Sequence, residues 1–339
     1  MQVHGKSESW ARERRRLAAE FGGSEARNTP AGRQAGRRRS QVVAELRRLA
    51  GAGLWLGLVV LGMVLWLLAR RAENEIVAGA RNFYGVLTVY EHQKTDPKAH
   101  HLLLQHGRIT HGLQFVAPEQ AHWPTTYYGD DSGVGLALNA LTPGFRRIGL
   151  VGLGTGTLAA YVQPGDYVRI YEINPEVKRL ATSLFTYVRD CAGQTEIVLG
   201  DARLSLEKEP PQGFDLLALD AFSSDAIPVH LLTREAFELY GRHVRTNGVI
   251  AVHVSNHFLD LEPVVINVAE ALGYKFAVTD YDETDEKWWL YSSTWILLSH
   301  DEGFLESVEM SASAVPRLPT KKDLPLWTDD YTSLVRIMK

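Results

Sequence analysis

Two carboxylates, Asp220 and Asp225, stand close together after an apolar segment in the stretch LDAFSSDAIP. An attacking amine must lose a proton before it forms a new bond, so a carboxylate beside it can act as a general base. A second carboxylate attracts the ammonium form and can hold the far end of the amine. Asp225 has a plainer alternative role, which is to shape the turn before Ile227 and Pro228. The pair predicts chemistry on an amine, with Asp220 as the base.

A glycine-rich loop, VGLGTGT at 151–157, follows one apolar segment and opens a predicted helix. Gly152, Gly154 and Gly156 allow the backbone to turn tightly and to approach a ligand without Cβ contact. The start of the following helix offers free N–H groups. A dinucleotide fingerprint requires G-x-G-x-x-G, whereas the sixth position here is Thr157. The loop therefore resembles the nucleoside-binding loop of the methyltransferase superfold instead.

Two further acids follow the next two predicted strands. Glu172 ends the strand in YVRIYEIN, twenty residues after Gly152, where a carboxylate can accept both hydroxyls of a ribose. Asp201 precedes Ala202 after the third strand, and it can accept a hydrogen bond from an adenine amino group. The alternatives are an exposed strand end for Glu172 and a turn or helix cap for Asp201. Because ligands of open α/β sheets bind beyond the carboxyl ends of the strands, we expect these acids and Asp220 to meet around one nucleoside.

The elements that must position these residues alternate between strands and helices. Short apolar runs without strict alternation predict a largely parallel sheet that is covered on both faces. The expected strands are 147–152, 167–173, 196–199, 214–219, 249–255, 275–279 and 294–299. The expected helices are 133–141 and stretches near 156–162, 175–189, 230–244 and 261–272. The earlier segments 84–90, 101–105 and 109–115 predict a small antiparallel β unit.

The N-terminal part of the chain has a different composition. The 339 residues carry a net charge of −4, yet residues 1–50 hold twelve Lys and Arg against five Asp and Glu. Residues 51–69 are uncharged over about 28 Å of helix and have Trp55 and Trp66 near their ends, which predicts one transmembrane helix. The alternatives are a signal peptide and a buried helix of a soluble protein. We expect residues 1–48 to be a basic, mostly disordered arm beside the membrane rather than a nucleic-acid-binding segment.

The side of the membrane on which the remaining residues lie stays open. The basic excess before residue 51 predicts a cytoplasmic N-terminus in a single-pass protein of the cell membrane, with the C-terminal part outside. An enzyme that uses an adenosyl nucleotide is expected in the cytosol, where such nucleotides are made. These two arguments conflict.

Charge and side-chain inventory exclude several functional classes. Residues 51–339 contain 24 basic and 35 acidic side chains, which suits a cationic substrate and gives no overall attraction to nucleic acid. Cys191 is the only cysteine, so the chain forms no intrachain disulfide. The histidines at 100, 101, 106 and 111 lack acids or cysteines at ligand spacing, so we expect no metal site.

In their order along the chain, these motifs resemble the polyamine aminopropyltransferases, typified by spermidine synthase. The more specific likeness is to a bacterial branch in which this domain follows membrane helices, and it covers most of residues 82–339. It is carried by QHGRITHG (105–112), TTYYG (125–129), VGLGTGT, YEIN, LGDAR, LDAFSSDAIPVHLLTREAF (219–237), GVIAVHVSN (248–256) and WTDDYTSL (327–334).

This resemblance implies an α/β fold of the class I methyltransferase-like (Rossmann-like) kind. A small N-terminal β-hairpin domain, 82–132, is expected to precede a catalytic domain with a seven-stranded sheet, 133–339. The implied co-substrate is decarboxylated S-adenosylmethionine, from which an aminopropyl group passes to an amine while methylthioadenosine leaves. No prosthetic group or metal is implied. The expected partners are the small-molecule amine and the membrane, and a homodimer is left open.

The resemblance also implies a role for each site residue. Glu172 binds the ribose, Asp201 binds the adenine and Asp220 takes the proton. Asp225 steadies the amine. A tyrosine of TTYYG, Tyr127 or Tyr128, lines the acceptor channel.

The sequence departs from the family pattern at three places. Thr155, which we expect to contact the substrate, stands where the family's glycine loop usually carries an acid that binds the aminopropyl ammonium group. The spacing from Asp220 to Asp225 is two residues longer than usual, and the hairpin glutamine is replaced near Thr110. These departures keep two alternatives open, a methyltransferase that uses S-adenosylmethionine and a membrane-tethered domain that binds polyamines or nucleosides without turnover.

Overall fold

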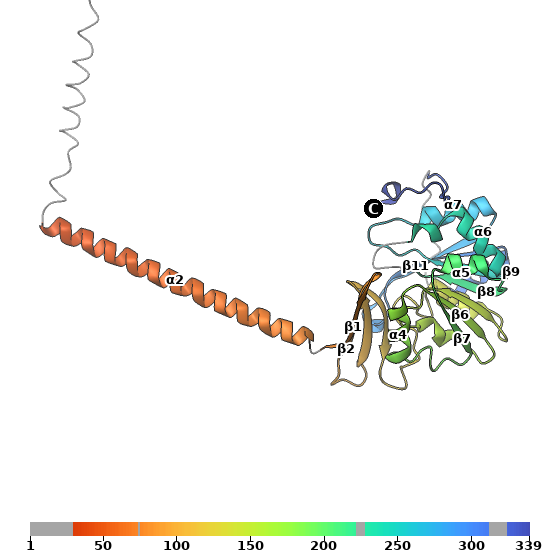
Figure 1. The fold of residues 1–339 in the computed structure, drawn as a ribbon, viewed down its shortest axis with the longest axis horizontal. Helices are drawn as coiled ribbons and strands as arrows, with labels where there is room; N and C mark the ends of the chain where they lie inside the picture. Colours follow the sequence, from red (N-terminus) through yellow and green to blue (C-terminus); the bar gives the residue numbers. More distant parts are fainter. Residues whose placement is uncertain (1–29, 74, 222–227, 312–323) are drawn as a thin grey trace, which may run out of the picture. The chain divides into compact units, whose positions relative to one another are not determined.

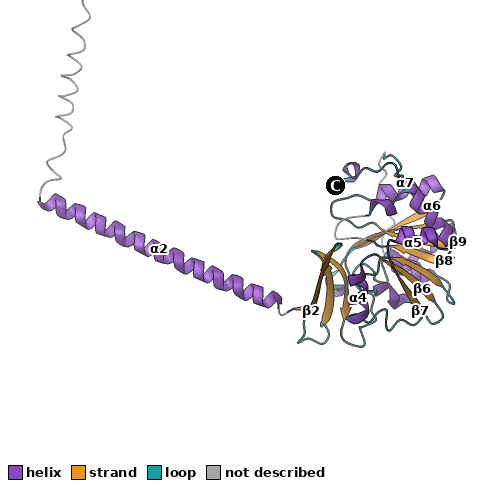
Figure 2. Cartoon of the chain, in the orientation of Figure 1, coloured by secondary structure: helices purple, strands orange, loops and turns teal. Residues whose placement is uncertain are grey.

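The computed structural model describes residues 30–73, 75–221, 228–311 and 324–339 (Figure 1). The chain divides into two compact units, Met1–Glu73 and Asn74–Lys339. The described part of the first unit is helical, whereas the second unit combines two sheets with surrounding helices (Figure 2).

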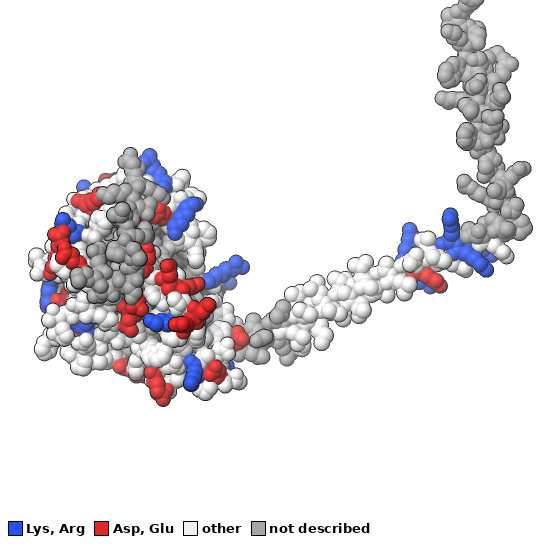
Figure 3. All heavy atoms as spheres, turned by 180° about the vertical axis from the view of Figure 1, so that it is seen from behind, with Lys and Arg blue, Asp and Glu red and all other residues white. Residues whose placement is uncertain are grey.

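The described residues of the first unit form one helix, α2 (Pro30–Glu73). Its segment Arg37–Leu67 is long and apolar enough to cross a membrane, judged by length and composition. The side chains of residues 52–67 are exposed, and Figure 3 shows basic groups near the N-terminal end of the helix and an uncharged stretch after them. The helix therefore contains the expected segment 51–69 and is longer than expected, at 44 residues.

The expectation of disorder over residues 1–48 is wrong for 30–48, which are helical, while 1–29 lie outside the described residues. The physical reason is helix propagation. Ala, Arg, Gln, Leu and Glu are good helix formers, so a helix nucleated in the apolar segment continues through them at little cost.

The second unit begins with a four-stranded antiparallel sheet in the order β1-β2-β3-β4. Its strands are β1 (Ile76–Asn82), β2 (Gly85–His92), β3 (His101–His106) and β4 (Ile109–Phe115). The sequence predicted the last three strands. The first strand, IVAGARN, contains several residues of low strand propensity, and its pairing with β2 decides its structure.

The larger sheet has the seven strands that the sequence predicted, and their order is β10-β11-β9-β8-β5-β6-β7. The strands are β5 (Arg147–Val151), β6 (Tyr167–Glu172), β7 (Gln194–Leu199), β8 (Phe214–Leu219), β9 (Val244–His253), β10 (Lys275–Tyr281) and β11 (Ser293–Ser299). Strands β5 to β9 run parallel, and β11 runs antiparallel to both of its neighbours.

Helices cover both faces of this sheet. One face packs against α3 (Gly133–Ala140), α4 (Pro175–Ser183), α8 (Glu302–Ser311) and the short helix η2 (Thr157–Tyr161). The other packs against α5 (Ala202–Lys208), α6 (Arg234–His243) and α7 (Glu262–Leu272). Alternate residues of β8 enter the two cores, with Leu216 in the first and Leu217 in the second. Helices α5 and α8 were not predicted, and three further short helices are η3 (Val229–Leu231), η4 (Asp285–Lys287) and η5 (Val335–Ile337).

The strand order places the ends of β5 and β8 side by side. The chain runs from β5 outward through β6 to β7, then returns to the other side of β5 as β8. Such a reversal opens a crevice at the carboxyl edge of the sheet, where loops diverge in opposite directions. The glycine loop follows β5 and Asp220 follows β8, so both lie at this crevice.

Candidate active site

The glycine loop and Asp220 are held together by the backbone. The Asp220 N–H donates to the Val151 carbonyl at 2.9 Å. Gly152 has a φ of +102°, and a Cβ built there would lie 2.3 Å from the Asp220 carbonyl oxygen. Only glycine combines this conformation with this close approach. Glycine at position 152 therefore allows the ends of β5 and β8 to lie this close together.

A cavity of about 160 Å³, the smaller cavity, opens at these strand ends. It collects residues that follow four neighbouring strands, together with side chains from the hairpin sheet. Of the residues predicted from the sequence it is lined by Gly152, Gly154, Glu172, Asp201, Ala202 and Asp220. The structure therefore brings these six around one space.

Glu172 is buried at the wall of the smaller cavity, and the backbone holds both of its oxygens. Oε2 accepts from the Leu153 N–H at 3.0 Å and Oε1 accepts from the Asn174 N–H at 2.7 Å. Burial raises the pKa of Glu172 above its usual value, against the opposing effect of these backbone donors. Each carboxylate oxygen can accept more than one hydrogen bond, so acceptor capacity remains for a ligand.

Asp201 begins α5 and is engaged on both oxygens. Oδ1 accepts from the Leu204 N–H at 2.9 Å, which caps the helix, and Oδ2 lies 2.8 Å from Nε2 of His230. The helix-cap reading of this residue is therefore correct, and it coexists with a position on the cavity wall.

A second cavity of about 660 Å³, the larger cavity, adjoins the smaller one. His111, Gly154 and Asp220 line both, so these residues mark the junction. The predicted Tyr127 and Tyr128 lie on its wall. Its other lining residues include His253, Ser255, Asn256, His257, Asp280, Asp282, Glu283, Tyr291 and Thr294.

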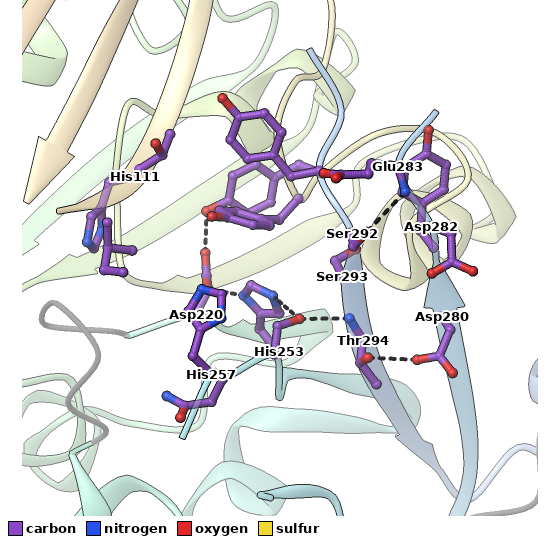
Figure 4. A pocket seen from close by; sticks show the side chains of 18 of the residues that line it. His111, Asp220, His253, His257, Asp280, Asp282, Glu283, Ser292, Ser293 and Thr294 are labelled. Atoms are coloured by element: carbon purple, nitrogen blue, oxygen red, sulfur yellow. Dashed lines mark hydrogen bonds and ion pairs between the residues drawn. The ribbon is translucent and has the colours of Figure 1, made fainter. Parts of the chain in front are cut away.

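Carboxylates gather on the wall of the larger cavity away from Asp220. Figure 4 shows His111 and Asp220 on one side and Asp280, Asp282 and Glu283 on the other. These three acids belong to the acidic segment 280–286. Carboxylates at both ends give the larger cavity an acidic character that suits a cation.

The carboxylate of Asp220 accepts a side-chain hydrogen bond on each of its oxygens. Its Oδ2 accepts from the Tyr128 hydroxyl at 2.5 Å, and its Oδ1 accepts from Nδ1 of His253 at 2.7 Å. Burial raises the pKa of Asp220. The nearby His253 and the hydrogen bonds from His253 and Tyr128 lower it by a larger amount, so the pKa of Asp220 lies below its usual value. Asp220 is therefore a fixed carboxylate at neutral pH.

His253 continues this network to the larger cavity. Its Nε2 lies 2.9 Å from the Ser255 hydroxyl, which accepts from the Thr294 N–H at 2.8 Å. The imidazole stacks on Trp295 with the ring centres 4.6 Å apart, and its side chain is 5 % exposed. The ring orientation is thereby fixed. The contact between His253 and Asp220 follows from the pairing of β8 with β9, which only the fold reveals.

Two predicted residues of the glycine loop line neither cavity. Thr155 is 1 % exposed, and its hydroxyl lies 2.8 Å from that of Thr157. Its side chain faces β4, because a Cβ at Gly112 would lie 2.1 Å from Thr155 Oγ1. Gly156 faces Val188 in the same way, at 2.7 Å. The prediction that Thr155 contacts substrate is therefore not supported by its position.

Asp225, a metal site and the histidines of the hairpin sheet were also considered from the sequence. Asp225 lies outside the described residues. Within the described ranges, no three His, Cys, Asp or Glu side chains are grouped so that they could hold a metal ion. His106 and His111 nevertheless enter the smaller cavity, which sequence reasoning did not foresee.

Comparisons with known proteins give a relative and a fold. No protein-family model matches the chain. Over 188 residues the chain is 27% identical to the polyamine aminopropyltransferase of Vibrio vulnificus, a match that covers 53% of this chain and 60% of that protein. The match thus spans less than two thirds of the relative's length.

Among solved structures, a probable spermidine synthase of Corynebacterium glutamicum has a TM-score of 0.52 at 18% identity, covering 74% of this chain and 98% of that one. The spermidine synthase of Thermotoga maritima has a TM-score of 0.47 at 11% identity, covering 76% and 82% of the two chains. The second unit has the mostly parallel, methyltransferase-like α/β fold of spermidine synthases, and the chain is similar in sequence to a polyamine aminopropyltransferase.

Proposed function

We propose that the chain is an aminopropyltransferase that moves an aminopropyl group from decarboxylated S-adenosylmethionine to an amine. The observation that carries this proposal is the position of Asp220 at the junction of two cavities. One cavity is built from the motifs expected to bind a nucleoside, and the other is lined with carboxylates. The aminopropyltransferase name of the Vibrio relative supports the same reaction.

The smaller cavity holds the nucleotide in this proposal. Glu172 accepts hydrogen bonds from the ribose hydroxyls with its remaining lone pairs, and Asp201 binds the adenine amino group. Gly152, Gly154 and Ala202 allow the backbone to approach the nucleoside closely. The nucleotide's sulfonium then lies towards the junction, within the field of Asp220.

The larger cavity holds the amine. Tyr127 and Tyr128 line its wall near the junction, and the acids of β10 and the following loop attract the far ammonium group. Asp225, in the same 219–228 stretch as Asp220, is retained as a further contact to the amine from sequence reasoning. An acceptor with at least two amino groups suits carboxylates at both ends.

The transfer itself requires few groups. The amine nitrogen attacks the carbon of the aminopropyl group that is bound to sulfur. A C–N bond forms, and the bond between this carbon and sulfur breaks with its electron pair passing to sulfur. Neutral methylthioadenosine leaves. Asp220 accepts the proton that the amine loses, and its hydrogen bonds to Tyr128 and His253 keep it ionised and oriented for this task.

Turnover with defined substrates tests the proposal. The full chain in detergent is incubated with decarboxylated S-adenosylmethionine and a panel of diamines and polyamines, and methylthioadenosine is measured. We expect release with at least one acceptor. No release with any acceptor would contradict the proposal.

A methyltransferase that uses S-adenosylmethionine is the second candidate, and Thr155 is the observation that favours it. The side chain at this position is turned away from both cavities, so the loop offers no acid to an aminopropyl ammonium group. Calorimetry with the two nucleotides separates the candidates. Tighter binding of the carboxylated nucleotide would favour methyl transfer, and binding without any turnover would favour a non-catalytic binding domain.

We also propose that α2 anchors the chain in the cell membrane as a single span. The support is the exposed apolar surface of residues 52–67. Each charged residue at the centre of a span costs about 2.5–3.5 kcal/mol on insertion scales. The full-length variant Val59→Asp/Val60→Asp/Leu61→Asp is therefore expected to leave the membrane fraction on carbonate extraction, while an Arg47→Asp control stays there. Retention of the triple variant would argue against a span.

A further inference from the structure

One buried nitrogen at the junction lacks a partner. Nε2 of His111 is inaccessible to solvent and makes no hydrogen bond within the described residues. Buried polar atoms in folded proteins nearly always have a partner. The neighbouring His106 is different, because its Nε2 bonds to the Tyr84 carbonyl at 2.7 Å. His111 is thus the histidine of this pair with capacity for a ligand.

The position of His111 is where the two cavities meet. It lies on β4, lines both cavities, and its own carbonyl oxygen would lie 2.7 Å from a Cβ at Gly154. In a group-transfer reaction, the transferred chain must occupy the junction between the donor and acceptor sites. A ligand group that completes His111 therefore belongs to that chain or directly adjoins it.

The charge state of His111 selects the kind of group. Burial lowers its pKa to about 4, and repulsion from His106 adds to this, against an opposing effect of Asp220. The imidazole is therefore neutral at physiological pH and carries a lone pair on one ring nitrogen. A lone pair beside the ionised Asp220 favours an ammonium group over a carboxylate.

With Thr155 in the glycine loop, the ammonium group of the transferred chain needs a hydrogen-bond acceptor from another element. The loop position that would carry an acid for the transferred group packs instead against Gly112 of β4. His111 is the residue immediately before Gly112 on the same strand. Packing against Gly112 turns the side chain at position 155 away from the cavities, and the same strand places His111 on their walls.

We infer that His111 is a specificity-determining residue, whose imidazole accepts a hydrogen bond from the terminal ammonium of the aminopropyl chain of the bound nucleotide. This inference rests on the proposed function, since it takes decarboxylated S-adenosylmethionine as the donor. It adds a residue from the hairpin sheet to the recognition of the transferred group.

Two ligands that share the methylthioadenosine body test the inference. Decarboxylated S-adenosylmethionine adds the aminopropyl chain and with it the positive charge of the sulfonium, and methylthioadenosine lacks both. Calorimetry on the full chain in detergent compares the wild type with His111→Phe, which keeps a ring, and His111→Gln, which keeps a hydrogen-bond acceptor. His92→Gln is the matched control, because His92 lies on β2 of the same sheet and lines neither cavity.

We expect His111→Phe to weaken binding of decarboxylated S-adenosylmethionine roughly 10- to 100-fold, as for the loss of a hydrogen bond to a charged group, with methylthioadenosine unchanged. His111→Gln retains most of the difference between the two ligands, and His92→Gln leaves the ratio of their affinities unchanged. Thermal unfolding of each variant verifies the fold.

Equal losses for both ligands in His111→Phe, or no loss for either, overturn the inference. A wild type that does not distinguish the two ligands overturns it as well. The proposed function fails separately: a wild type that prefers decarboxylated S-adenosylmethionine but releases no methylthioadenosine with any amine contradicts turnover while the His111 comparison still stands.

Discussion

Nδ1 of His253 lies 2.7 Å from Oδ1 of Asp220, across the paired ends of β9 and β8. The carboxylate accepts this hydrogen bond on one oxygen and that of Tyr128 on the other. A buried carboxylate without such donors tends to take up a proton. The contact therefore keeps Asp220 charged and directed at the junction of the two cavities.

Asp220→Asn removes the proposed base while keeping the size of the side chain. We expect kcat to fall about 10²–10⁴-fold, the usual contribution of general-base catalysis, with the affinity for the neutral methylthioadenosine nearly unchanged. Asp215→Asn, at the opposite end of the same strand, is the matched control and keeps kcat within a few-fold. Steady-state kinetics and calorimetry measure both quantities. Near-normal turnover in Asp220→Asn would remove it from the proposed mechanism.

His253→Gln tests whether the imidazole acts through Asp220. The amide can still donate to Oδ1, but it loses the stacking on Trp295 that fixes the donor. We expect kcat to fall roughly tenfold, as for a weakened hydrogen bond to a charged group, while KM for the nucleotide stays constant. His253→Leu, which has no donor, falls further. A residue with only a structural role would lower the melting temperature without this graded effect on kcat.

Glu172→Gln replaces one acceptor oxygen by an NH₂ group that faces a backbone N–H. The oxygens of Glu172 now accept from Leu153 and Asn174, so the variant loses one of these bonds as well as a ribose contact. We expect methylthioadenosine to bind roughly 10- to 100-fold more weakly. Calorimetry checks the affinity. An unchanged dissociation constant would separate Glu172 from nucleoside binding.

Thr155→Asp restores the acid usual in the family at this position. Because the site is 1 % exposed and packs against Gly112, the new carboxylate is buried. We expect a loss of about 3 kcal/mol in stability and no gain in affinity for decarboxylated S-adenosylmethionine. Thr155→Ser is the control. A stable variant with tighter nucleotide binding would show that the loop can turn towards the cavity.

The pH dependence of stability reports on His111. Its folded pKa of about 4 lies below the unfolded value of about 6.5, so the unfolded chain binds the proton first as the pH falls. The contribution of neutral His111 is complete above pH 6.5 or so and is lost between about 6.5 and 4, by at most about 3 kcal/mol. We expect wild type to lose more stability than His111→Gln between pH 7 and pH 5. Parallel melting curves for the two proteins would contradict the shift.

Much of the smaller cavity could be predicted from the sequence because its residues follow strands directly. The spacing from Gly152 to Glu172, and the positions of Asp201 and Asp220 after apolar runs, are local features of the chain. Parallel strands bring such positions to one edge of a sheet, whatever the remaining packing. Seven strands and most of the larger helices were recognised for the same reason, since each has its own apolar pattern.

Patterns along the sequence did not predict elements whose structure depends on a neighbouring element. Strand β1 forms through its pairing with β2, and residues 30–48 continue an apolar helix. Short amphipathic segments such as α5 carry too few residues for a clear helical period.

The sequence by itself determined which backbone ends carry glycines and acids, because these are properties of single segments. The tertiary structure decided which side chains those ends face. It turned Thr155 towards Gly112, brought His253 to Asp220, and carried His111 and the acids of β10 and the following loop to a common space. The reason is that these contacts join elements distant along the chain, and their distances depend on how the hairpin sheet packs on the larger one.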